Sequence, residues 1–371
     1  MKNSLKKQLE SQKKREKEEQ ILQELLCSSR LVKTDFPLMN NNSLAIIGNG
    51  FDVAHGIPSR YYDFRDKAKG SVRDVLELFI DVEDVWADFE NNLAYLDREK
   101  VLWNMWNEKY LNGVLDEEDD DFSAADFFMS VEDGGWAITT IINDLPIVFR
   151  RWINSLKITD CVPRFNLRND SRFLTFNYTE TLETVYGIVK ENIKYIHGDR
   201  RDKECNLVLG HGHDTEAVFD EWWERNKNRP EFQPYLYGRR GRRFKNDNPV
   251  YLAYFLEDDA KGNWHSQTNY DYIENCVRMI EGYYDDSAKK TADVIKRNRG
   301  YFNELSSVED IVTIGHSLSE VDMPYFVEIA RHVSKNTMWH LGFHSLRDYK
   351  RIDQFIMELG LDTSKVSVFR I

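Results

Sequence analysis

The chain has 371 residues and a formal net charge of −13, which disfavours nonspecific association of most of its surface with nucleic acid or anionic lipid. Hydrophobic residues make up 41% and aromatic residues 13% of the chain, which excludes a disordered protein. No apolar run approaches the roughly 20 residues of a membrane-spanning helix, and the N-terminus is too polar for a signal peptide. We therefore expect a soluble protein of the cytoplasm that does not associate with membranes.

The four cysteines, Cys27, Cys161, Cys205 and Cys276, lie far apart in the sequence. None of them forms a CxxC motif or a Cys/His ligand pair, so neither a disulfide framework nor a zinc site is indicated. We expect reduced thiols, no bound metal and no required cofactor.

Residues 1–40 are predicted to form a helical arm. The first 30 residues are rich in Lys, Glu and Gln, and their sparse apolar positions fit a solvated helix whose C-terminal half has an apolar face. These positions are Leu5, Leu9, Ile21, Leu22, Leu25 and Leu26. Three interpretations stay open: the face packs on a partner subunit in a homo-oligomer, it docks on its own chain, or the arm is frayed.

Residues 41–371 are predicted to form one α/β domain with helical inserts near 71–170 and 215–305. The first strand, at 43–47, leads into the glycine turn at 48–52 and then into a helix near 59–69. Further strands are expected at 172–175, 193–196, 207–209, 310–314, 337–341 and 365–370, with tail helices at 322–333 and 346–358. Because strands alternate with helices, we expect a doubly wound, mostly parallel, Rossmann-like sheet.

Glycines and polar side chains follow several of these strands, at 48–52, 176–179, 197–198 and 315–317. In doubly wound sheets, ligands bind beyond the carboxyl ends of the strands. One rim of the sheet is therefore expected to collect the ligand-binding residues. The candidates are Gly48, Asn49, Gly50, Phe51, Asp52, Gly315, His316 and Ser317.

The glycine turn favours a nucleotide ligand. Gly48 and Gly50 let the backbone turn tightly and approach a ligand, while the N-terminus of the next helix offers N–H groups to a pyrophosphate. The full G-x-G-x-x-G fingerprint is absent because residue 53 is Val, and Gly-Asn-Gly is also common in ordinary turns. An ordinary turn is therefore the alternative.

Three side chains on the predicted rim are candidates for catalysis. The Asn177 amide could hold a ribose hydroxyl or a water molecule, and His197 could act as a general base near neutral pH. Asp52 could contact a ribose or position a water. Each also has a structural interpretation: a turn asparagine, a structural histidine, and an acidic residue that favours the first turn of a helix.

The basic cluster Arg239–Lys245 could bind nucleic acid or phosphate. No base-stacking motif surrounds it, and arginine runs that contain glycine are usually solvated loops. Both interpretations stay open.

Taken together, these motifs resemble the bacteriophage abortive-infection AbiH family. The glycine turn lies within the segment 46–58 that carries the resemblance, and further landmarks follow at 86–90, 176–183, 196–198, 209–212 and 315–318, with Asp322. The resemblance implies an antiphage protein, with a phage component as trigger or a second defence protein as partner.

The AbiH pattern is in turn similar to sirtuin-like defence domains, which bind and hydrolyse NAD. This similarity implies that the phosphate and nicotinamide-ribose end of NAD lies against Gly48, Gly50, Phe51 and Asp52. It also implies that Asn177 holds the ribose or water, that His197 is the base, and that Gly315 and Ser317 face the adenosine. The chain departs from that pattern at Asn49, at the Phe51-Asp52 pair and at Thr179, which stands where a second acidic residue is expected.

The favoured hypothesis is an antiphage effector that cleaves the nicotinamide–ribose bond of NAD, with NAD as its substrate. One alternative is a non-catalytic nucleotide-binding sensor or scaffold in a defence complex. Another is a nucleic-acid-directed toxin that uses the arginine cluster, although the acidic net charge counts against it.

Overall fold

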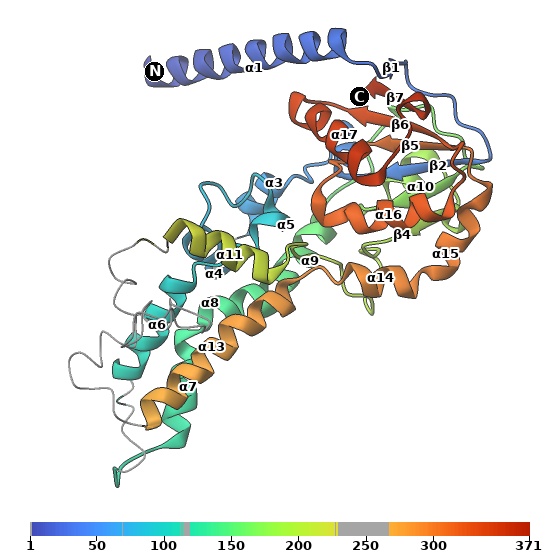
Figure 1. Ribbon diagram of the computed structural model, residues 1–371. Helices are drawn as coiled ribbons and strands as arrows, with labels where there is room; N and C mark the ends of the chain where they lie inside the picture. Colours follow the sequence, from blue (N-terminus) through green and yellow to red (C-terminus); the bar gives the residue numbers. More distant parts are fainter. Residues whose placement is uncertain (1, 69, 112, 114–118, 227, 229–266) are drawn as a thin grey trace, which may run out of the picture. The chain divides into compact units, whose positions relative to one another are not determined.

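The fold is built on a parallel sheet of seven strands in the order β1-β7-β6-β5-β2-β3-β4 (Figure 1). The computed structural model describes residues 2–68, 70–111, 113, 119–226, 228 and 267–371. The strands are β1 (Val32–Lys33), β2 (Ser43–Ile47), β3 (Arg172–Thr175), β4 (Ile193–Tyr195), β5 (Asp310–Ile314), β6 (Met338–Phe343) and β7 (Val366–Arg370). The basic cluster Arg239–Lys245 lies outside the described residues.

The centre of the sheet is the pair β2 and β5. Every residue of β2 is buried, as expected for a parallel strand that is covered on both faces. Ile47 pairs in register with Ile314 of β5 on one side and with Thr175 of β3 on the other. Chain order therefore reverses between β2 and β5, which makes the gap between their carboxyl ends the topological switch point of the sheet. The predicted doubly wound α/β fold is confirmed.

The chain is divided into two compact units. Unit 1 comprises Met1–Phe64, Arg150–Val208 and Lys290–Ile371, and unit 2 comprises Arg65–Phe149 and Leu209–Lys289. Unit 1 contains all seven strands. The predicted inserts overlap unit 2, but their last residues, from 150 and from 290 onward, belong to unit 1.

Short helices connect the strands of unit 1. They include α2 (Asn49–Ala54), α10 (Thr181–Tyr186), α14 (Thr291–Arg297), α15 (Arg299–Asn303), α16 (Met323–His332) and α17 (Leu346–Leu359). Ser345 and Asp348 form a capping box at the start of α17, and Gly360 ends it in the left-handed conformation. These signals explain why the helices and strands of the tail are confirmed close to their predicted bounds.

The strand that we predicted at 207–209 is wrong. The N–H of Val208 donates to the carbonyl oxygen of His197 at 2.9 Å, and its carbonyl accepts the Tyr178 hydroxyl at 2.8 Å. The backbone of this apolar segment is thus bonded to the loops after β3 and β4, and it forms no ladder with a strand. Conversely, the two-residue edge strand β1 was too short to predict.

Unit 2 is helical in its described residues. Its helices include α4 (Ser71–Phe79), α5 (Phe89–Asn92), α6 (Arg98–Leu111), α7 (Ala124–Gly134), α8 (Trp136–Thr139), the π-helix η1 (Thr140–Asp144), α11 (Thr215–Asn226) and α13 (Gln267–Ser287). Helices α3 (Tyr61–Lys67) and α9 (Leu145–Ser155) cross the sequence boundaries between the units. Within the part of the chain that the structure describes, no helix is long and apolar enough to span a membrane.

The N-terminal helix α1 (Lys2–Ser28) docks its last turns on unit 1. Leu22 and Leu26 are buried in the same hydrophobic cluster as the inner face of α17. Glu19 forms an ion pair with Arg370 at the end of β7, at 2.7 Å. Of the three interpretations of the arm, docking on its own chain therefore holds for this half of the helix, while a homo-oligomer stays a prediction.

Candidate functional site

The loops after β2 and β5 meet at the switch point through their backbones. The N–H of Gly50 donates to the carbonyl oxygen of Gly315 at 2.7 Å, and that of Gly48 to Ile314 at 3.0 Å. A Cβ atom on Gly50 would lie 2.8 Å from the Cα atom of Gly315, closer than such atoms can approach. Glycine is thus required here because two backbones touch, a long-range reason that the sequence did not reveal.

This contact changes how the glycine turn can act. We expected its N–H groups to face a phosphate, but those of Gly48 and Gly50 have carbonyl acceptors within the protein. The Asn49 amide donates to the carbonyl oxygen of Ser59 at 2.8 Å. Phe51 is fully buried and stacks on Phe165, with ring centroids 5.4 Å apart, so its side chain belongs to the core. Asn49 and Gly50 are the exposed residues of the turn.

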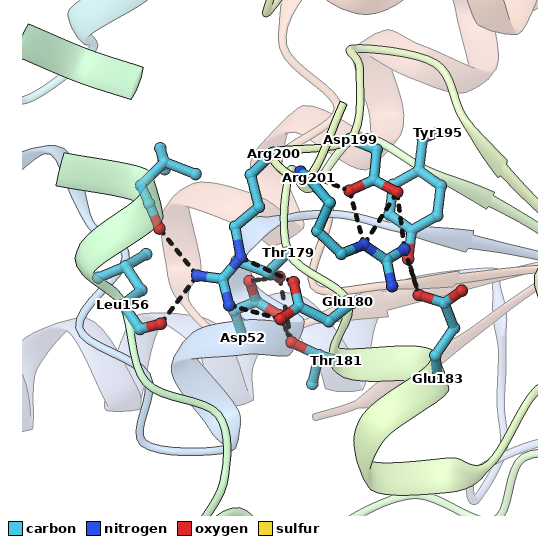
Figure 2. A network of polar contacts seen from close by, with 11 residues as sticks. Asp52, Leu156, Thr179, Glu180, Thr181, Glu183, Tyr195, Asp199, Arg200 and Arg201 are labelled. Atoms are coloured by element: carbon cyan, nitrogen blue, oxygen red, sulfur yellow. Dashed lines mark hydrogen bonds and ion pairs between the residues drawn. The ribbon is translucent and has the colours of Figure 1, made fainter. Parts of the chain in front are cut away.

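Asp52, in the first turn of α2, places a carboxylate in the interior of the rim. It is 1% exposed and accepts hydrogen bonds from the hydroxyls of Thr179 at 2.5 Å and Thr181 at 2.8 Å (Figure 2). Burial raises the pKa of Asp52 to about 6, against the opposing effect of hydrogen bonds from Thr179, Thr181 and Asn177 and of the Arg200 charge. The carboxyl group can therefore change its protonation state near neutral pH.

The loop after β3 supplies the partners of this carboxylate. Asn177 is buried, its N–H donates to the Thr175 hydroxyl at 3.1 Å, and its side chain is close enough to lower the pKa of Asp52. Thr179, which departs from the sirtuin-like pattern, is one of the two hydroxyl donors to Asp52. The structure thus brings together Asp52 and Asn177, two of the three predicted catalytic residues.

Two adjacent arginines, which sequence reasoning missed, hold the loop that follows β4. Arg200 makes a two-pronged contact with the Glu180 carboxylate at 2.7 and 2.6 Å, and its remaining nitrogen donates to the carbonyls of Ile153 and Leu156 (Figure 2). Arg201 pairs with Asp199 at 2.6 Å and is much more exposed. Arg200 therefore ties the loop to the segment that carries Thr179 and Thr181.

A second polar cluster joins two rim histidines around one carboxylate, and we call it the His-Asp-His cluster. Asp322 lies with one oxygen 3.5 Å from Nε2 of His197 and the other 3.4 Å from Nε2 of His316. All three side chains are buried. The ring of Phe176 packs edge-on against both imidazoles, with centroids 4.8 and 4.4 Å away. The third predicted catalytic residue, His197, thus lies beside a carboxylate that sequence reasoning had not assigned to the site.

The loop after β5 shapes this cluster. The N–H of Leu318 donates to Nδ1 of His316 at 3.0 Å, and Leu318 has a φ of +51°, the one non-glycine residue with positive φ in the described chain. Such a backbone conformation persists only where the surroundings impose it. Ser317 is exposed, whereas His316 points inward to Asp322. Ser317 and His316, two of the predicted cofactor-binding residues, therefore differ: the first is exposed and the second is buried against Asp322.

A further landmark segment and the question of a metal site concern residues beyond these two clusters. The landmark segment 209–212, which contains His211, belongs to unit 2. Among the described residues, no group of three or more His, Cys, Asp and Glu side chains could hold a metal ion.

The fold and the rim define a doubly wound α/β protein with buried titratable groups in the loops beyond the carboxyl ends of its strands. The family model described as "Bacteriophage abortive infection AbiH" matches residues 44–343, which include both clusters. The chain belongs to the bacteriophage abortive infection AbiH family. No curated protein and no solved structure matched the chain.

Proposed function

We propose that this chain is an antiphage effector of abortive infection that hydrolyses the bond between nicotinamide and ribose in NAD. Family membership supports the antiphage role. The observation that carries the enzymatic part is the buried carboxylate of Asp52, which lies beside Asn177 between the loops after β2 and β3. Doubly wound sheets bind their ligands beyond the carboxyl ends of their strands.

The reaction needs a group that stabilises positive charge on the ribose. As the bond from ribose C1 to the nicotinamide nitrogen breaks, its electron pair leaves with nicotinamide and the sugar becomes an oxocarbenium-like cation. An ionised Asp52 in a site with little water would stabilise that cation strongly. Asn177 would hold the ribose or the attacking water, which gives its oxygen to C1 and a proton to His197. The products are ADP-ribose and nicotinamide.

A second candidate, a nucleotide-binding sensor without turnover, is favoured by one specific observation. Several polar atoms of the rim already have protein partners: Asp52 accepts from two threonines, and the N–H groups of Gly48 and Gly50 bond to the carbonyls of Ile314, at the end of β5, and Gly315. In this function the nucleotide would contact the exposed backbone at Asn49 and Gly50 and leave intact.

The two candidates are separated by incubating the purified full chain with NAD and following NAD, nicotinamide and ADP-ribose by mass spectrometry. We expect nicotinamide and ADP-ribose in equal amounts. Asn177→Ala and His197→Ala should each abolish release by removing groups that hold or deprotonate the reactants. The matched control is His332→Ala, because His332 lies at the end of α16 with its own carboxylate neighbour, Glu328, at 3.6 Å.

Circular dichroism must show that the variants remain folded. The same incubation is repeated with extract of phage-infected cells, which supplies a phage trigger or partner protein. Absence of nicotinamide in every arm contradicts the enzymatic proposal. Recovery of intact NAD on the purified protein would then support the sensor.

A further inference from the structure

The His-Asp-His cluster contains two imidazoles that share one carboxylate, and the structure distinguishes them. His316 receives the Leu318 N–H on its Nδ1 atom, so this nitrogen acts as an acceptor and carries no proton. The proton of the neutral ring is therefore on Nε2, which faces Asp322 at 3.4 Å. The second hydrogen-bonding partner of a histidine fixes which of its nitrogens is protonated.

Asp322 is oriented toward the histidines by its place in the fold. It stands at the N-cap of α16, where an aspartate commonly accepts a hydrogen bond from the helix backbone. Its side chain makes no capping hydrogen bond. Instead its two oxygens face Nε2 of His197 and Nε2 of His316, within ion-pair range but longer than an ideal hydrogen bond. Such contacts are commonly long before substrate binds.

We propose that Asp322 is a positioning residue that fixes the proton of His197 on Nε2 and so makes Nδ1 the nitrogen that accepts a proton. A carboxylate accepts hydrogen bonds and donates none, so a neutral His197 that faces it presents an Nε2–H. The second carboxylate oxygen is directed to His316, which keeps the acid from rotating away. The tautomer of His197 does not depend on the proposed function. Only the statement that Nδ1 takes a proton from the attacking water rests on it.

Aromatic rings also pack against His197. Tyr178 and Tyr325 pack against its ring with centroids 6.2 and 5.5 Å away, and Phe176 meets it edge-on. The rings restrict the orientation of the imidazole. The Asp322 carboxylate, 3.5 Å from Nε2, is the charged group that acts on the tautomer in this proposal.

The decisive variant is Asp322→Asn, because an amide keeps the shape of the acid but has one acceptor and one donor. His316 is still bound by the Leu318 N–H, so its Nε2–H takes the amide oxygen. The amide NH₂ then faces Nε2 of His197. This nitrogen must accept a hydrogen bond from the amide, so the proton of the neutral ring moves to Nδ1. A wrong tautomer of this kind disables a catalytic histidine while leaving the local geometry intact.

The experiment is long-range ¹H–¹⁵N correlation NMR of protein with labelled histidine at about pH 8, where an ordinary imidazole is neutral. The chain has nine histidines, and signals are assigned with His197→Gln and His316→Gln. Both rings should be Nε2–H tautomers in the wild type. In Asp322→Asn, His197 should become Nδ1–H while His316 stays Nε2–H. The control is His332, whose tautomer should stay the same.

The readout needs no substrate, so it distinguishes failure of this inference from failure of the proposed function. An Nδ1–H tautomer of His197 in the wild type overturns the inference, even if the variant does not fold. An unchanged His197 tautomer in a folded Asp322→Asn variant also overturns it. Where the wild type hydrolyses NAD, Asp322→Asn should lower kcat by about 100-fold or more with little change in KM, and Asp322→Glu should restore part of it.

Discussion

A Cβ atom on Gly315 would lie 2.2 Å from the backbone nitrogen of Phe51. Gly315 has a φ of +67°, so an alanine there meets both backbone strain and a collision with the first turn of α2. Gly187 has the same φ of +67° but open space around its Cα. Comparing alanine substitutions at these two glycines therefore separates the effect of backbone strain from the effect of the steric collision.

We expect Gly315→Ala to lower the free energy of unfolding by about 3 kcal/mol or more. Gly187→Ala should lower it by about 1 kcal/mol, which is the strain alone. Urea denaturation followed by circular dichroism measures both. Equal effects of the two substitutions would mean that the loops after β2 and β5 separate at little cost.

Asp52 should make the protein less stable as pH rises from about 4 to about 6. In this window the folded state keeps the proton that the unfolded state has released, because burial raises the pKa of Asp52 to about 6. The contribution is about 3 kcal/mol and is constant above the folded pKa. Asp52→Asn should remove this dependence, measured as the difference between variant and wild type in urea denaturation at several pH values.

Asp199 serves as a control, because its effect on stability should change with pH in the opposite direction to that of Asp52. Burial acts to raise its pKa, but hydrogen bonds from Arg201 lower it more, so the pKa of Asp199 lies below its ordinary value. Its contribution to stability is therefore present above the unfolded pKa and is lost as pH falls through the folded pKa. The difference in unfolding free energy between wild type and Asp199→Asn, plotted against pH, should thus have a slope opposite to the same difference for Asp52→Asn. A slope of the same sign for both would refute the assignment.

Arg200→Lys should be strongly destabilising although it keeps the charge. Lysine cannot reproduce the planar contact with Glu180 and the donation to two carbonyls at once. Because Arg200 is 10% exposed, we expect a loss of about 3 kcal/mol in unfolding free energy. Arg201→Lys, at a 40% exposed side chain, should change it by less than about 1 kcal/mol. Thermal and urea denaturation compare the two, and similar losses would contradict a special role of Arg200.

Leu22→Ala tests the docking of α1. Leu22 is 1% exposed, so its truncation should lower the unfolding free energy by about 2–4 kcal/mol. Leu38, at 86% exposure, gives a matched control whose replacement by alanine should have an effect within about 0.5 kcal/mol. If Leu22→Ala had no effect on the isolated chain but dissociated an oligomer in analytical ultracentrifugation, the helix would instead serve a partner subunit.

Local patterns predicted much of the fold. The buried run 43–47, the capping signals of α17 and the alternation of strands with helices are properties of neighbouring residues, so they could be read from the sequence. The placement of Asn177, His197 and Gly315 at strand ends followed from the same alternation. The segment at 207–209 shows the limit, because three apolar residues resemble a strand whether or not a neighbour is available to pair with them.

The parts of the site that could not be predicted depend on pairs of residues far apart in the chain. Asp322 meets His197 across 125 positions of sequence, and Thr181 meets Asp52 across 129. Nothing in either local segment indicates its partner. The same holds for Gly48 and Gly50, whose N–H groups were expected to be available until the loop after β5 was seen to use them.

Because β5 lies between β2 and β6, the sheet cannot be completed in the order in which the chain is synthesised. When residues up to 208 have emerged from the ribosome, β2 can pair with β3 and β3 with β4, but the other edge of β2 has no neighbour until residues 310–314 arrive. Contacts that close over such long separations form slowly, and an open strand edge is prone to pairing with other chains. A nascent or truncated chain that ends before β5 therefore lacks Gly315, His316 and Asp322, so the rim exists only in molecules whose synthesis is almost finished.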